Sequence, residues 1–184
     1  MPARAPFAPQ PSPVRAPADA SGGGGDLAAT REAFASAIGH IALAIGDKPL
    51  DADLQVWLNA TYPATGPDSR RLAELIRTGF DEGWLMPRSA NGIAFGRPIK
   101  PHGAAARCSV DVVRMDDVKG PHHRHPQGDI GFIVPISGTP AFDGMTCGWY
   151  VYEPGSAHVP TVSGGAAFVL YLLPDGAIEF TGQP

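Results

Sequence analysis

Four residues in the second half of the chain have the types and spacing of a metal site. His123 and His125 are separated by one residue, and Asp129 follows four positions later. Side chains on a strand alternate between its two faces, so these three positions would share one face. His158 follows a Pro-Gly turn further along and would complete a set of three nitrogens and one oxygen. Such ligands suit a divalent transition metal and leave positions open for water or substrate.

The other histidines and the metal's identity are less defined by the sequence. His122 has the opposite strand parity from His123, so we expect it to support the site or face solvent, although it is an alternative to Asp129 in the ligand set. His40 and His102 lie outside the two motifs and are expected to be ordinary packed or exposed residues. Mixed nitrogen and oxygen sites follow the Irving–Williams order, so iron, manganese, zinc and nickel all fit.

Composition predicts a globular protein and argues against several partners. The chain has 184 residues, 43% of them hydrophobic, which is enough for a sizeable core. A net charge of −4 gives no general attraction to nucleic acid or to an anionic membrane. Cys108 and Cys147 form no CxxC pair, so free thiols in a reducing compartment are expected. Because no apolar run reaches the length of a membrane span and no signal peptide is evident, we expect a cytoplasmic protein.

The first half of the chain is predicted to contain a tail and a helical region. Residues 1–25 are rich in Pro, Ala and Gly and are expected to be flexible. Apolar residues then recur at helical spacing within 26–88 and predict three helices, at 26–47, 52–60 and 69–82. Packing, dimer contact and covering of a barrel mouth are all consistent with this region. DNA binding is disfavoured because the connector TYPATGPD is too long for a helix-turn-helix.

The remaining residues, 89–184, change to a pattern of short apolar runs. Gly, Pro, Asn and Asp separate the runs, which lie at 92–95, 108–115, 131–135, 146–152, 166–173 and 178–180. Many short strands between turn residues are typical of an antiparallel sandwich or barrel. The fold class predicted is therefore mainly β.

The histidine motifs also resemble those of a known superfamily. A Gly at 120, the HxH pair, the acid at 129 and the PGxxH stretch at 154–158 resemble the two motifs of the cupins. The resemblance covers roughly 105–180 and implies a cupin-type jelly-roll barrel with a metal in its mouth. It also implies His123, His125, Asp129 and His158 as ligands, although the family usually has Glu where Asp129 stands. A homodimer is expected from the same resemblance.

Longer stretches resemble one narrower group, the 4-hydroxylaminobenzoate lyase family of bacterial nitroaromatic degradation. These stretches are GPHHRHPQGDIGFIVPISGTPAFDG, GWYVYEPGSAHVPTVSGG and VLYLLPDGAIEF. The resemblance implies that 4-hydroxylaminobenzoate and water give protocatechuate (3,4-dihydroxybenzoate) and ammonia. That reaction is redox-neutral, and the chain has neither a GxGxxG motif before a helix nor a Walker loop, so no nucleotide cofactor is expected.

A flat aromatic carboxylate requires apolar walls and a cation or amide donors. Arg114 shares strand parity with apolar neighbours and is a candidate carboxylate clamp, with a surface arginine as the alternative. Glu153 adjoins the PGxxH turn and is a candidate proton shuttle or an exposed residue. The candidate walls, each of which could instead belong to the core, are Phe132, Trp149, Tyr150 and Tyr171.

Two other functions fit the same residues, because one fold hosts many reactions. The first is another cupin enzyme, such as a dioxygenase or isomerase of a small aromatic acid, and oxygen consumption with iron(II) would identify it. The second is a non-enzymatic cupin that senses a ligand, with the helical region as effector. Retarded migration of DNA would support this second function, and the acidic charge of the chain argues against it.

Overall fold

The computed structural model describes residues 24–182 and places three helices before nine strands. The helices are α1 (Gly24–Ile45), α2 (Ala52–Thr61) and α3 (Pro67–Asp81), so the predicted helical region is confirmed. The strands are β1 (Arg88–Ala90), β2 (Ile93–Ile99), β3 (Cys108–Lys119), β4 (His123–His125), β5 (Asp129–Phe142), β6 (Gly148–Tyr152), β7 (Ser156–His158), β8 (Thr161–Pro174) and β9 (Glu179–Phe180). Of the flexible tail predicted over 1–25, residues 1–23 lie outside the described part, and Gly24 already begins α1.

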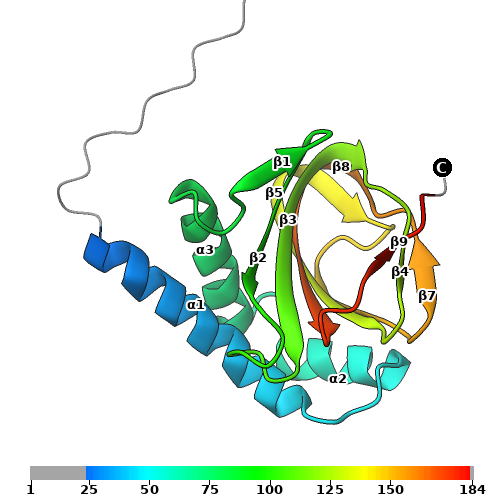
Figure 1. Cartoon of the computed structure of the whole chain (residues 1–184), viewed down its shortest axis with the longest axis horizontal. Helices are drawn as coiled ribbons and strands as arrows, with labels where there is room; N and C mark the ends of the chain where they lie inside the picture. Colours follow the sequence, from blue (N-terminus) through cyan, green and yellow to red (C-terminus); the bar gives the residue numbers. More distant parts are fainter. Residues whose placement is uncertain (1–23, 183–184) are drawn as a thin grey trace, which may run out of the picture.

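The strands form two antiparallel sheets that curl around a common interior (Figure 1). The larger sheet has six strands in the order β1-β2-β3-β8-β5-β6, and the smaller has three in the order β7-β4-β9. The helices cover the outer side of the larger sheet (Figure 1). This arrangement confirms the prediction of a mainly β barrel preceded by a helical region.

Local chemistry explains where the short helix α2 begins and what it covers. The Asp51 carboxylate accepts a hydrogen bond from the Leu54 amide at 3.0 Å and so caps the helix N-terminus. At its other side, the Asn59 amide group donates to the Trp149 carbonyl at 2.8 Å and accepts from the Trp149 amide at 3.0 Å. Strand β6 lies at the edge of the larger sheet, so α2 satisfies backbone groups that would otherwise be open to another chain.

Both faces of the larger sheet are apolar, and each belongs to a different part of the core. Ile130, Phe132 and Val134 pack with the helices on the outer face. The alternate residue Ile133 packs inside the barrel, together with Tyr150 and Tyr171 from neighbouring strands. Strand alternation therefore decides which side chains reach the barrel interior.

Two further predictions concern the cysteines and the helices. Both Cys108 and Cys147 are free thiols, as predicted. Within residues 24–182, none of the helices combines the length and apolar character needed to cross a membrane.

Candidate metal centre

The smaller sheet brings the predicted histidines together. His123 and His125 lie on the same face of β4, and Arg124 between them is exposed. Strand β7 pairs with β4 in a register that sets His158 opposite His123. The two β4 imidazoles are buried, with 4% and 0% of their surfaces exposed.

The three imidazoles converge through equivalent ring nitrogens. The Nε2 atom of His123 lies 3.0 Å from those of His125 and His158, and the last two are 3.2 Å apart. Among the described residues, these three histidines form the group of His, Cys, Asp or Glu side chains whose ligand atoms are close enough to share one ion.

The other ring nitrogens determine what the converging atoms can do. His123 Nδ1 lies 3.0 Å from the Pro121 carbonyl oxygen, which can only accept, so Nδ1 carries the proton and Nε2 is left with a lone pair. His158 Nδ1 lies 2.5 Å from Asp143 Oδ2 and is protonated for the same reason. Two lone pairs that face each other at 3.0 Å repel unless a cation lies between them. The donor set therefore fits a divalent transition metal.

Burial keeps the imidazoles of His123 and His125 neutral. It lowers the pKa of His123 to about 4, and the hydrogen bond to Pro121 opposes this shift only in part. Burial, with the neighbouring histidines, lowers the pKa of His125 to about 3. A metal binds only the unprotonated imidazole, so both residues are in the ligating form at neutral pH.

Asp143 is a site residue that the sequence analysis missed. It lies after β5 at a backbone φ of 48°, within a Phe-Asp-Gly sequence that indicates a turn. Besides His158, its carboxylate accepts from the Tyr152 hydroxyl at 2.9 Å and from the Thr161 amide at 2.8 Å. Burial acts to raise the pKa of Asp143, but the hydrogen bond from His158 and those from Thr161 and Tyr152 outweigh it, so the pKa lies below its ordinary value. An ionised Asp143 thus orients His158.

Asp129, which was predicted to be the fourth ligand, lies outside the histidine group. It is fully buried on β5, where its Oδ2 accepts from the Tyr150 hydroxyl at 3.1 Å and its Oδ1 has no hydrogen-bond partner within 24–182. Burial raises the pKa of Asp129 well above its ordinary value. His122 does not replace it, because its Nδ1 lies 2.5 Å from the Thr181 hydroxyl.

Gly131 explains how the Tyr150 ring reaches Asp129. A Cβ atom at position 131 would lie 1.8 Å from Cζ of Tyr150, so the ring lies directly against the β5 backbone. Only glycine leaves room for this approach.

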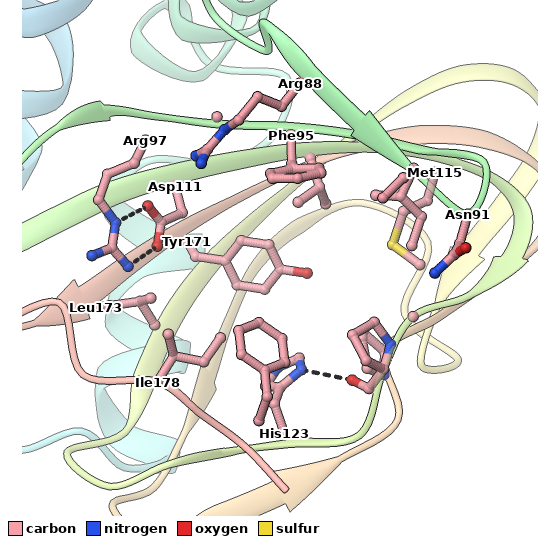
Figure 2. Close-up of a pocket in the computed structure, with 18 of the residues that line it drawn as sticks. Arg88, Asn91, Phe95, Arg97, Asp111, Met115, His123, Tyr171, Leu173 and Ile178 are labelled. Atoms are coloured by element: carbon pink, nitrogen blue, oxygen red, sulfur yellow. Dashed lines mark hydrogen bonds and ion pairs between the residues drawn. The ribbon is translucent and has the colours of Figure 1, made fainter. Parts of the chain in front are cut away.

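A cavity of about 880 Å³ opens beside the histidine group (Figure 2). His123 lines it, and the Tyr171 hydroxyl points into it (Figure 2). Its apolar walls include Ile93, Phe95, Val113, Met115, Leu173 and Ile178. This volume and lining suit a small aromatic molecule.

Of the four predicted walls, the structure places only Tyr171 on the cavity. Phe132 and Trp149 lie on the outer face of the larger sheet, with their ring centroids 4.6 Å apart, and pack against the helices. The Trp149 indole N–H donates to the Tyr62 carbonyl at 3.0 Å. Tyr150 packs in the interior but does not line the cavity. The sheet alternation explains why adjacent aromatic residues separate in this way.

The two predicted polar residues also lie away from the cavity. Arg114 is on the helix-facing side of β3, where its guanidinium carbon is 6.0 Å from the Phe80 ring centroid and its Nη2 is 3.2 Å from Asp116. Glu153 is exposed in the turn before β7. The cavity instead receives cations that the sequence analysis did not single out, namely Arg88, Arg97 and Lys119.

The family model and the two sequence relatives that match this chain share one description. The family model for PnbB, 4-hydroxylaminobenzoate lyase, matches residues 36–180. A 4-hydroxylaminobenzoate lyase of Nocardioides sp. (strain LMS-CY) is 32% identical over 141 residues, which span 72% of this chain and 83% of the relative. One of Pseudomonas putida is 28% identical over 159 residues, spanning 76% of this chain and 89% of the relative. A solved structure of DMSP lyases matches 86% of this chain and 97% of its own, at 13% identity and a TM-score of 0.41.

Proposed function

Because the chain belongs to the 4-hydroxylaminobenzoate lyase family, we propose that it converts 4-hydroxylaminobenzoate and water to protocatechuate and ammonia. The observation that carries this proposal is the set of three Nε2 atoms, 3.0 to 3.2 Å apart, beside a cavity with apolar walls. Such a cavity accepts a flat aromatic ring, and the nitrogens mark where its reactive substituent would lie.

The proposal includes one divalent transition metal ion, held by His123, His125 and His158. A bound ion of this kind supplies Lewis acidity toward the hydroxylamino oxygen and lowers the pKa of water. Three neutral imidazoles leave the charge of the ion uncompensated, which favours an electrophilic role. Asp143 and the Pro121 carbonyl hold two of the rings in the ligating tautomer.

The reaction balances without an oxidant or a reductant. The N–O bond breaks and the hydroxylamino oxygen leaves as water, so the ring becomes electron-poor. One water then adds to the ring carbon next to the nitrogen-bearing carbon. A second water adds to the nitrogen-bearing carbon and displaces the nitrogen as ammonia. Loss of a ring proton restores the aromatic diol, and one water is consumed overall.

Tyr171 is suited to assist the departure of the hydroxylamino oxygen. Its hydroxyl points into the cavity that His123 also lines (Figure 2). Burial raises the pKa of Tyr171 well above its usual range, so the hydroxyl stays protonated at neutral pH. It can therefore donate a hydrogen bond to the leaving oxygen.

The test combines metal analysis with a product assay on the purified protein. Under anaerobic conditions in heavy-oxygen water, we expect ammonia and protocatechuate that carries the label in its ring hydroxyl groups. Product that forms only with dioxygen, and carries its oxygen, would instead identify an oxygenase. Removal of metal with a chelator should abolish activity, and re-addition of single metals should identify the active one.

A further inference from the structure

The ionisable residues of the cavity have an excess of positive charge. Three side-chain cations, Arg88, Arg97 and Lys119, line it together with one carboxylate, that of Asp111. The chain as a whole carries a net charge of −4, so the cavity differs in sign from the rest of the molecule. A cationic cavity favours an anionic ligand.

Arg97 cannot supply this excess alone, because Asp111 already neutralises it. Its Nε lies 2.5 Å from Asp111 Oδ1 and its Nη2 lies 2.8 Å from Oδ2, so the two side chains form a bidentate pair (Figure 2). The same Nη2 lies 3.4 Å from the Gly176 carbonyl. The pair fixes Arg97 in the cavity wall but leaves little net charge there.

Arg88 has no salt bridge to an acid within residues 24–182, although its charge acts on the Asp111 carboxylate from a distance. Its guanidinium carbon lies 4.9 Å from the centre of the Phe95 ring, on the strand paired with β1. It forms no ion pair with a described carboxylate. Stacking on an aromatic face orients the guanidinium and leaves its N–H edge available for a planar carboxylate.

The position of Arg88 matches the shape of a para-substituted ring. Figure 2 shows Arg88 and Arg97 on the side of the cavity opposite His123. The two substituents of such a ring point in opposite directions, so one held at the histidines directs the other toward the side of the cavity where Arg88 lies. Lys119 is less suitable, because it precedes the Gly120-Pro121 segment that holds His123 and so lies toward the histidine side.

We propose that Arg88 binds the carboxylate of the substrate and makes the enzyme specific for para-substituted aromatic carboxylates. Arg97, held by Asp111, forms the wall beside it. This inference rests on the proposed function only in taking the reactive group to lie at the histidines. The apolar walls between the two ends then hold the ring.

Titration of the purified protein with 4-aminobenzoate tests the carboxylate site without turnover. This ligand has an amine where the substrate has its hydroxylamino group. Charge-assisted hydrogen bonds predict that Arg88→Gln weakens binding about 10- to 100-fold and that Arg88→Lys has a smaller effect. Aniline lacks the carboxylate, so its weaker binding should be the same in wild type and Arg88→Gln.

Arg114→Gln is the matched control, because Arg114 lies on the other face of the larger sheet. We expect it to bind 4-aminobenzoate as the wild type does. Equal affinity in wild type and Arg88→Gln, with unchanged thermal unfolding, would overturn the inference, as would a loss of affinity confined to Arg114→Gln. A protein that binds 4-aminobenzoate through Arg88 yet releases no ammonia from 4-hydroxylaminobenzoate would support the carboxylate site and refute the proposed reaction.

Discussion

Asp143 Oδ2 lies 2.5 Å from Nδ1 of His158, although the two residues belong to separate parts of the barrel. Asp143 follows β5, whereas His158 ends β7 in the smaller sheet. The contact thus links the two sheets at the candidate metal centre. It also fixes the tautomer in which the imidazole presents a lone pair to the other histidines.

Replacement of this carboxylate should weaken metal binding more than folding. Asp143→Asn retains the shape of the side chain but removes the charge that stabilises protonated Nδ1 of His158. We expect zinc(II) affinity, measured by competition with a chelator, to fall about 10- to 100-fold. Asp116→Asn, which alters an exposed acid, should leave the affinity unchanged. Equal affinities in all three proteins would show that Asp143 does not orient the ligand.

Adjacent histidines provide a second test of the centre. His123→Ala removes one of the three converging nitrogens. Its metal affinity should therefore fall by more than the about 10- to 100-fold expected when a residue that only orients a ligand is lost. His122→Ala should retain metal, since His122 contacts Thr181 instead. Metal content per chain after purification measures both effects. If the His122 variant loses metal and the His123 variant keeps it, then His122 and not His123 faces the metal centre.

The two histidine motifs were readable from the sequence because their geometry is local. Alternation along β4 sets His123 and His125 on one face, and the Pro-Gly turn starts the strand that carries His158. Asp143 and Arg88 were not predicted, because their roles depend on how distant segments pack together. Nothing within a few residues of either position indicates that contact.

The substrate walls were harder to predict for a different physical reason. Both faces of the larger sheet are apolar, one against helices and one inside the barrel. The periodicity of β5 and β6 therefore separates Phe132 and Trp149 from their neighbours without showing which face is the interior. The prediction of a carboxylate clamp at Arg114 meets the same difficulty, since its strand face packs against α3.

Asp129 should make stability depend on pH in a predictable direction. Its folded-state pKa lies well above 3.8, so folding favours the protonated form. The stabilisation is complete below that value and is lost as the pH rises toward the folded-state pKa. Relative to wild type, Asp129→Asn should therefore gain stability with rising pH, by up to about 1.4 kcal/mol per pH unit in this window. Denaturant unfolding at several pH values measures the difference.

The same variant tests whether Asp129 ligates metal. The carboxylate lies outside the histidine group and its hydrogen-bond partner is the Tyr150 hydroxyl, so Asp129→Asn should retain metal. Loss of metal from this variant, with the fold intact, would restore Asp129 as the fourth ligand. A flat pH dependence of the stability difference would point to an ionised carboxylate in both states.

Variants of Tyr171 and Trp149 distinguish a side chain that assists the reaction from one that only stabilises the core. Tyr171→Phe removes only the hydroxyl that points into the cavity, so kcat/KM for 4-hydroxylaminobenzoate should fall about 100-fold or more while 4-aminobenzoate binding changes little. Trp149→Phe removes the indole N–H donated to the Tyr62 carbonyl on the other face. It should lower the free energy of unfolding by about 1 kcal/mol or more and leave kcat/KM unchanged. A selective loss of turnover in Trp149→Phe, with full turnover in Tyr171→Phe, would place the substrate on the helix-facing side of the sheet.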